Sequence, residues 1–226
     1  MTTRTNQSAQ TDTRTRLLRT SLAIFAHRDF EAVSVREIVE QAGANIAAIS
    51  YHFGGKRGLY LATAEFLADS LQTVLGPTLA RTRAGAENAD PGTAGRLLDE
   101  MIHTLVHKLI MDRLGDDAAG FILREQHQPT AAFDILYERL MLPIQSTYQL
   151  LGSRILGSVE PNSRQQILIT HALIGQILAF RTARTTVLRR LGQTDFSQQD
   201  ARQIADVISR LTLNALHSDN KRNSSS

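Results

Sequence analysis

The hydrophobic residues of this chain recur mainly at intervals of three and four positions, which is the period of an amphipathic helix. Stretches that contain Gly, Pro and Asn separate the periodic segments and mark turns. We therefore predict an all-α protein, with helices over approximately residues 12–27, 35–42, 46–53, 56–75, 94–111, 118–126, 130–156, 163–190 and 197–217. Residues 76–95 are predicted to form a long loop. Pro143 is predicted to kink the helix that contains it or to mark an irregular turn.

The short segment after residue 33 carries the signals of a capped helix. Val35, Ile38 and Val39 share one helical face. Ser34 precedes them and Glu37 follows three residues later, which predicts a capping box. In this motif the hydroxyl accepts from the backbone N–H of residue 37, and the carboxylate reaches back to the start of the helix.

A tight turn and a second short helix are predicted to follow. Gly43 tolerates the left-handed conformation of a sharp helix exit, and Asn45 is a good N-cap. Ile46, Ile49 and Phe53 recur at helical spacing and form an apolar back. The other positions are small or polar, namely Ala47, Ala48, Ser50, Tyr51 and His52. A narrow back with a small, hydrogen-bonding front suits a helix that enters a DNA major groove, although an ordinary pair of packed helices has the same period.

The positive charge of the chain is concentrated near its N-terminus. Residues 1–60 carry eight basic and five acidic side chains, whereas the remainder carries 17 of each, so the net charge of +3 lies entirely in the first part. Lys and Arg contacts with phosphates provide the sequence-independent part of DNA affinity. The excess supports a DNA-binding function for this part, and a solvated basic surface is the alternative.

Composition narrows the class of protein. The chain has 226 residues and no cysteine, which excludes disulfides and thiolate chemistry. It contains no run of about 18 apolar residues, and its N-terminus lacks the apolar region of a secretory signal. We expect a cytoplasmic protein that does not span a membrane.

Residues 13–60 resemble the DNA-binding domain of the TetR family of transcriptional regulators. The similarity rests on TRTRLLRTSLAIFAHRDF, VREIVEQAGAN and ISYHFGGKRGLY, and most specifically on YHF with Lys56 just beyond it. Two positions depart from the family pattern, since Asp29 replaces a usual Gly and Ala48 replaces a frequent Thr. The resemblance implies DNA-binding roles for Ser34, Arg36, Asn45, Ala47, Ala48, Ser50, Tyr51, His52 and Lys56.

The same resemblance implies a two-domain organisation. We expect a three-helix DNA-binding domain over residues 12–58 and a larger helical domain for ligand binding and dimerisation over residues 59–217. The polar residues 1–11 and 218–226 are expected to be flexible tails.

The stretch REQHQPTAAFDILYERLMLPI resembles the ligand domain of the CecR-like subgroup of this family. The family binds small effectors among the helices of this domain, and hydrophobic compounds are the class that the subgroup suggests. The expected pocket residues are apolar or aromatic, with polar anchors among them: Met101, His103, Leu105, Phe121, Arg124, Phe133, Tyr137, Met141, Ile174 and Leu178. A Met and aromatic set at helical spacing is also typical of a plain core.

The two C-terminal helices are candidates for a dimer interface, as in the family. Ala172, Gly175 and Ala179 place small residues at helical spacing, which allows another helix to approach closely. Ile204, Ile208 and Leu211 form an apolar stripe on the last helix. Packing within one chain explains the same pattern and remains the alternative.

The histidines are the remaining candidates for chemistry. His103 and His107 lie four residues apart on one helix, a spacing at which two imidazoles can share a metal, but the HExxH pattern and an assigned third ligand are both missing. The sequence also lacks a nucleophile elbow, a P-loop and a dinucleotide-binding turn. We expect neither catalysis nor a cofactor or metal.

The function predicted from the sequence is ligand-responsive regulation of transcription. A homodimer would bind double-stranded operator DNA at a near-palindromic site and repress transcription until a small-molecule effector releases it. The alternative is a helical small-molecule-binding protein or an enzyme without sequence-specific DNA binding.

Overall fold

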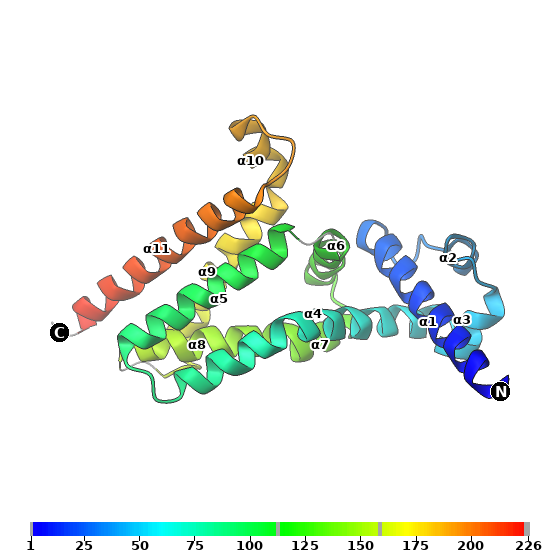
Figure 1. The fold of residues 1–226 in the computed structure, drawn as a ribbon, viewed down its shortest axis with the longest axis horizontal. Helices are drawn as coiled ribbons and strands as arrows, with labels where there is room; N and C mark the ends of the chain where they lie inside the picture. Colours follow the sequence, from blue (N-terminus) through cyan, green and yellow to red (C-terminus); the bar gives the residue numbers. More distant parts are fainter. Residues whose placement is uncertain (1, 112–113, 158–159, 224–226) are drawn as a thin grey trace. The chain divides into compact units, whose positions relative to one another are not determined.

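The computed structural model describes residues 2–111, 114–157 and 160–223, and every regular element in these ranges is helical (Figure 1). The all-α fold class is therefore confirmed. In chain order the helices are α1 (Thr2–His27), α2 (Val35–Ala42), α3 (Ile46–Phe53), α4 (Lys56–Ala86), α5 (Pro91–Met111), α6 (Leu114–His127), α7 (Ala131–Leu136), the π-helix η1 (Tyr137–Met141), α8 (Leu142–Leu156), α9 (Arg164–Thr182), α10 (Arg184–Leu191) and α11 (Gln198–Asn223).

The chain forms two compact units, and the first is built from two separate stretches of sequence. It contains residues up to 72 together with 116–140, whereas the second contains 73–115 and 141 onward. The first unit therefore holds not only α1, α2 and α3 but also α7 and nearly all of α6. The predicted DNA-binding domain, residues 12–58, is a part of this larger unit.

The turn between α2 and α3 is capped as the sequence predicts. Ser34 Oγ accepts from the backbone N–H of Glu37 at 3.1 Å. Gly43 ends α2 in the left-handed conformation, with φ of 59°. Asn45 Oδ1 accepts from the backbone N–H of Ala48 at 2.8 Å and starts α3. The second half of the predicted capping box differs, because the Glu37 carboxylate pairs with Arg28 instead.

An aromatic cluster in the first unit joins α6 to the helices of the DNA-binding domain. Tyr60 of α4 contacts Phe25 of α1 edge-on, with ring centroids 4.8 Å apart, and Phe30 at 5.1 Å. Phe121 of α6 completes the cluster at 5.1 Å from Tyr60 and is fully buried. Large apolar area is thus removed from water at the junction of α1, α4 and α6, which fixes their mutual packing.

α1 is longer than its hydrophobic pattern predicts. It begins at Thr2, within the predicted flexible tail 1–11, of which Met1 lies outside the described residues. Residues 2–11 contain neither Gly nor Pro, so the helix propagates backward from its packed part without a break. α11 likewise extends into the predicted tail 218–226 as far as Asn223, and residues 224–226 lie outside the described residues.

α4 also continues through a predicted loop. The helix runs past Pro77 to Ala86, and only a short turn separates it from α5. A proline in a helix interior costs about 3 kcal/mol, because it removes one hydrogen bond and crowds the preceding turn. Leu75, Thr82 and Ala86 are nevertheless buried, so side-chain packing on both sides of Pro77 outweighs that local cost.

Pro143 lies beside an irregular turn, as predicted. The π-helix η1 ends two residues before it, and α8 then starts with Pro143 in its first turn. There the missing N–H leaves no helical hydrogen bond unmade. The predicted single helix over 163–190 is instead divided at Ala183 into α9 and α10.

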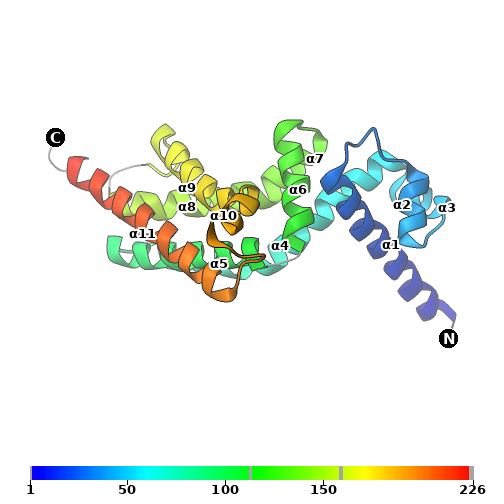
Figure 2. The same cartoon turned by 90° about the horizontal axis from the view of Figure 1, so that it is seen from above.

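The core of the second unit is formed by α5, α8, α9 and α11, which lie together in both views (Figures 1 and 2). α5 contributes the buried residues Leu98, Met101, Ile102, Leu105 and Val106. Arg154 of α8 donates to the carbonyl of Ala86 at 3.1 Å and so binds the C-terminal end of α4. None of the described helices carries an apolar stretch long enough to cross a membrane.

Candidate nucleic-acid interface

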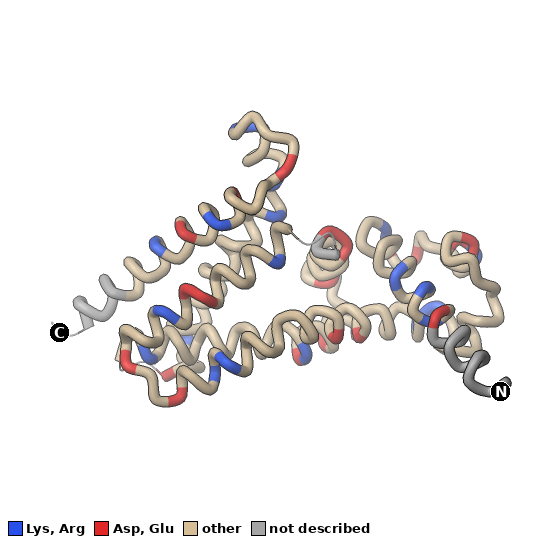
Figure 3. The backbone as a smooth tube through the Cα atoms, viewed as in Figure 1, with Lys and Arg blue, Asp and Glu red and all other residues tan. Residues whose placement is uncertain are grey.

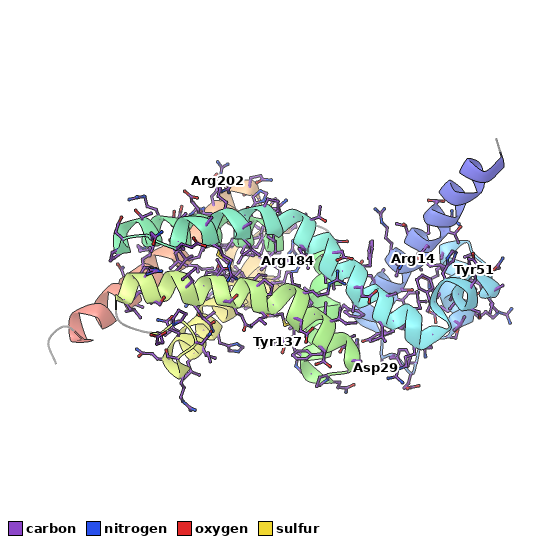
Figure 4. The ribbon with its side chains drawn as sticks, turned by 90° about the horizontal axis from the view of Figure 1, so that it is seen from below. Arg14, Asp29, Tyr51, Tyr137, Arg184 and Arg202 are labelled. Carbon is purple, nitrogen blue, oxygen red and sulfur yellow. The ribbon has the colours of Figure 1, made fainter. Side chains whose placement is uncertain are left out.

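α3 presents a small, polar surface to solvent and buries one narrow edge. Ile49 is 1% exposed and packs into the first unit, while Phe53 is half-buried. Tyr51 is 73% exposed and is therefore free to reach a partner (Figure 4). Ile46 is 54% exposed, so its predicted place in the apolar back is wrong. It lies in the first turn of α3, beyond the edge that contacts α1 and α2.

The remaining α3 candidates lie around this exposed tyrosine. Ala47 and Ser50 are exposed, and Ala48 and His52 are half-buried. The Tyr51 and His52 rings contact each other edge-on, 4.9 Å apart. The helix thus has a front where small side chains let the backbone approach a partner closely, with one large aromatic residue at its side.

The flanking candidates are held by contacts within the protein. Asn45 and Ser34 are exposed, but their side-chain oxygens cap α3 and α2. Arg36 is exposed and pairs with Glu40 on the same helix at 2.9 Å. Lys56 lies over the Phe30 ring at 4.3 Å, and its ammonium is 3.5 Å from the carbonyl oxygen of Glu31.

Three arginines near α3 were not predicted as site residues. Arg14 of α1 lies over the Phe53 ring at 5.5 Å, and Arg57 is exposed in the first turn of α4. Arg16 donates to the carbonyl of Ala42 at 3.3 Å and so helps to cap the end of α2. The basic positions along α1 are visible in Figure 3. The concentration of charge in residues 1–60 was the signal that pointed to them.

The predicted effector residues fall into both units. In the second unit Met101 and Leu105 are buried, while His103, Met141, Ile174 and Leu178 are half-buried. In the first unit Phe121 is buried in the aromatic cluster, and Phe133 stacks on the exposed Tyr137 with centroids 6.0 Å apart. Arg124, predicted to be a polar anchor, donates to the Phe25 carbonyl of α1 and to the carboxylate of Asp29 just beyond α1.

A groove of about 340 Å³ is open on the surface of the second unit. His103 and His107 of α5 line it, and each faces α11 through a different partner. His103 Nε2 is 3.3 Å from the Asp206 carboxylate, whereas His107 Nε2 is 2.9 Å from Gln198 Oε1. Across the part of the chain that the structure describes, no group of three or more His, Asp or Glu is arranged to hold a metal ion.

The predicted dimer residues divide by exposure. Ala172, Gly175 and Ala179 are exposed on α9, and Leu211 on α11 is 55% exposed. A Cβ added to Gly175 would meet no atom within 4 Å, so that face of α9 is open. The predicted Ile204 and Ile208, by contrast, are 8% and 1% exposed, because they belong to the core of the second unit itself. They are not available to a partner chain.

The two parts of the chain match two family models. Residues 17–63 match the bacterial regulatory proteins of the tetR family, and residues 94–217 match the C-terminal domain of the HTH-type transcriptional dual regulator CecR. The chain is 36% identical over 195 residues to the HTH-type transcriptional dual regulator CecR of Shigella flexneri, which covers 85% of this chain and 86% of that relative.

Solved structures share the fold at low sequence identity. One is AibR in complex with isovaleryl coenzyme A and operator DNA, with a TM-score of 0.62, 13% identity, and coverage of 88% of this chain and 97% of that chain. Another is Mycobacterium smegmatis AmtR, with a TM-score of 0.56, 14% identity and coverage of 92% of both chains. The chain therefore belongs to the TetR family of DNA-binding transcriptional regulators and carries a C-terminal domain of the CecR type.

Proposed function

We propose that this regulator acts in the cytoplasm as a homodimer that binds a near-palindromic operator through α3 and represses transcription until a small hydrophobic effector binds. Two α3 helices would enter successive major grooves, whose centres are about 34–36 Å apart on one face of the duplex. Ala47, Ala48 and Ser50 would face base edges and thymine methyl groups. Tyr51 and His52 would contact phosphates beside them.

The exposed front of α3 is the observation that supports this proposal most directly. A tyrosine that is 73% exposed gains nothing from the protein's own core, yet it projects from a short helix that is capped at both ends. Small neighbours on either side leave room for a groove wall. These features are expected of a helix that binds DNA and are not needed in a helix that only stabilises the fold.

Replacing Tyr51 with Ala provides the test. We expect Tyr51→Ala to lose operator binding in a gel-shift with the DNA that flanks the protein's own gene, while the dimer stays intact by light scattering. Tyr137→Ala is the matched control, because Tyr137 is also exposed but lies on η1. Full affinity of Tyr51→Ala at physiological salt would contradict the proposal and favour a helical ligand-binding protein without sequence-specific DNA binding.

The dimer is proposed to form through α9 and α11. The exposed apolar residues of these helices lie on faces that the chain itself leaves uncovered, and they include Ile167, Leu168, Val207 and Leu211. Leu211→Asp should convert the dimer to monomer and weaken operator binding with it, because two linked heads bind far more tightly than one. A monomeric wild-type protein would contradict this part of the proposal.

Effector binding is proposed for the second unit. AibR was crystallised with both a coenzyme A thioester and operator DNA, which supports small-molecule control on this fold. A ligand releases the operator only if it binds the DNA-incompetent conformation more tightly. A thermal-shift screen of hydrophobic compounds, followed by gel-shift release, identifies such a ligand. The dual-regulator name of the Shigella flexneri relative makes activation the alternative output, which a reporter assay distinguishes.

A further inference from the structure

One side of α6 is fitted against the helices of the DNA-binding domain. Gly120 lies so close to α1 that an added Cβ would be 2.7 Å from the carbonyl oxygen of Ala26. One residue on, Phe121 enters the aromatic cluster. One turn further along the same side, Arg124 and Glu125 bond to α1 and α4. Positions 120, 121, 124 and 125 share one helical face, so α6 has a single defined position against α1.

Arg124 binds the C-terminal end of α1 in two ways. Its Nε donates to the carbonyl of Phe25 at 3.0 Å, and its Nη1 bonds to the Asp29 carboxylate. The last carbonyls of a helix have no partner within the helix and carry its negative dipole end, so a guanidinium there is favourable. The bond to Asp29 lies just beyond α1 and fixes the second residue of the turn that follows.

The turn held by Arg124 leads directly to α2. We call residues 28–34 the corner. Inside it the N–H of Ala32 donates to the carbonyl of Asp29 at 3.1 Å. Arg28 donates to the Ala32 carbonyl at 2.8 Å and pairs with Glu37 in the first turn of α2. Lys56 lies on the opposite side, over Phe30 and 3.5 Å from the carbonyl of Glu31. Three cationic side chains from α6, the corner and α4 thus hold its backbone carbonyls and the end of α1.

We infer that Arg124 is a positioning residue for operator binding, which acts through the corner on α2 and α3 without touching DNA. Asp29 is its specific partner. This inference rests on the proposed operator binding by α3. It adds that α6, through Arg124, sets the orientation of α2 and α3. α2 and α3 contact α1 and each other, so a displaced corner moves α3 relative to its groove.

A salt series separates a positioning role from a phosphate contact. Each protein–phosphate contact contributes about one to the slope of log affinity against log salt concentration. The operator duplex is selected from a random library with wild-type protein. We expect Arg124→Gln to bind it about tenfold more weakly at every salt concentration with an unchanged slope, because the substitution displaces the corner without removing a phosphate contact. Lys56→Ala should lower the slope by about one.

Asp29→Asn tests the partner at an exposed carboxylate, where the substitution spares the core. It should weaken binding about threefold, and the double variant should bind no more weakly than Arg124→Gln alone, because both changes remove the same bond. Arg139→Gln is the control, since it removes another exposed ion pair of the first unit, with Asp69. If Arg124→Gln does not fold, the Asp29→Asn result alone decides the question.

Three outcomes would overturn the inference. The first is wild-type affinity in both Arg124→Gln and Asp29→Asn. The second is a salt slope lowered by about one in Arg124→Gln, as expected for a phosphate contact. The third is an Arg124→Gln variant in which only the response to effector changes, as expected for the predicted ligand anchor. A failure of the proposed function looks different, because it shows as full operator affinity in Tyr51→Ala.

Discussion

The two units differ in how their largest buried polar side chains are hydrogen-bonded. In the first unit the Glu125 carboxylate is fully buried and accepts from Tyr60 Oη at 2.5 Å, from Thr130 N at 2.9 Å and from Thr130 Oγ1 at 3.0 Å. In the second unit the Tyr148 hydroxyl and the Gln166 side-chain amide are buried, and neither forms a hydrogen bond with a described residue. The Ser21 hydroxyl is a smaller exception in the first unit.

This difference shows that the first unit is held in one arrangement, whereas the second unit can gain hydrogen bonds by rearranging. A fully bonded buried carboxylate permits one arrangement of its neighbours, which suits a module that must present α3 at a defined angle. A buried polar group without a partner costs about 1–3 kcal/mol. The second unit therefore carries polar groups that gain free energy from any rearrangement or bound molecule that supplies a partner.

The largest expected effect is a loss of stability at alkaline pH, and it comes from a buried tyrosine in each unit. Burial raises the pKa of Tyr60, with the hydrogen bond to Glu125 adding to the shift, and burial raises the pKa of Tyr148. Both phenols titrate near 10.0 when exposed, so above that pH only the unfolded state loses their protons. The two phenols therefore leave the free energy of unfolding unchanged below pH 10. Above pH 10 each phenol lowers it by about 1.4 kcal/mol per pH unit.

Urea unfolding at a series of pH values measures this slope. Tyr60→Phe and Tyr148→Phe should each remove the contribution of one phenol, and the double variant should remove both. A slope above pH 10 that is the same in the double variant and in wild type would show that these phenols are not its source.

The next largest effect is expected at Glu125 of the first unit. Glu125→Ala leaves the Tyr60 hydroxyl and the Thr130 N–H buried without their acceptor, and it opens a cavity, so we expect a loss of about 3 kcal/mol in unfolding free energy. Glu138→Ala on η1 is the control, because Glu138 is exposed. Chemical denaturation with far-UV circular dichroism measures both. If both substitutions lowered the free energy of unfolding equally, the hydrogen bonds of Glu125 would not stabilise the first unit as proposed.

A matched pair of substitutions compares the units directly near neutral pH. Tyr60→Phe deprives a buried carboxylate of a donor and should cost about 2 kcal/mol, since hydrogen bonds to charged groups are worth about 1.5–3 kcal/mol. Tyr148→Phe removes a hydroxyl that has no partner and should leave stability unchanged or raise it by up to about 1 kcal/mol. The same denaturation curves give both values, and a cost for Tyr148→Phe as large as that for Tyr60→Phe would refute the comparison.

The smallest effect is expected at Gln166. Met has a similar length and shape without the amide, so Gln166→Met should stabilise the second unit by about 1 kcal/mol. Gln149 of α8 is also buried, and Gln149→Met serves as the control because its side chain is not among the unpaired groups. Thermal melting of both variants tests this. A lower melting temperature for Gln166→Met would mean that the amide has a partner in solution.

Local signals in the sequence were sufficient for the DNA-reading part of the fold. Ser34, Gly43 and Asn45 each act within three or four residues of their own position, and the structure places all three as predicted. The exposed front of α3 follows from the same short-range period. Ile46 is the exception, because helical spacing alone does not show where a helix leaves the surface that buries it.

The remainder depended on contacts between distant parts of the chain. Pro77 was predicted to interrupt a helix, and the buried residues on both sides of it keep the helix intact. Arg124 bonds to Phe25 and Asp29, which lie almost one hundred residues earlier. No local pattern in the sequence encodes such a pairing, so the role of α6 in the first unit became visible only in the structure.

The discontinuous make-up of the first unit has a consequence for the order of events during synthesis. The ribosome adds about 5–20 residues per second, so Phe121 and Glu125 are made on the order of ten seconds after the helix-turn-helix segment has left the peptidyl-transferase centre. Until then the aromatic faces of Phe25 and Tyr60 lack the helix that covers them. A nascent chain of this regulator therefore cannot complete the packing of its DNA-binding unit until translation has passed Glu125.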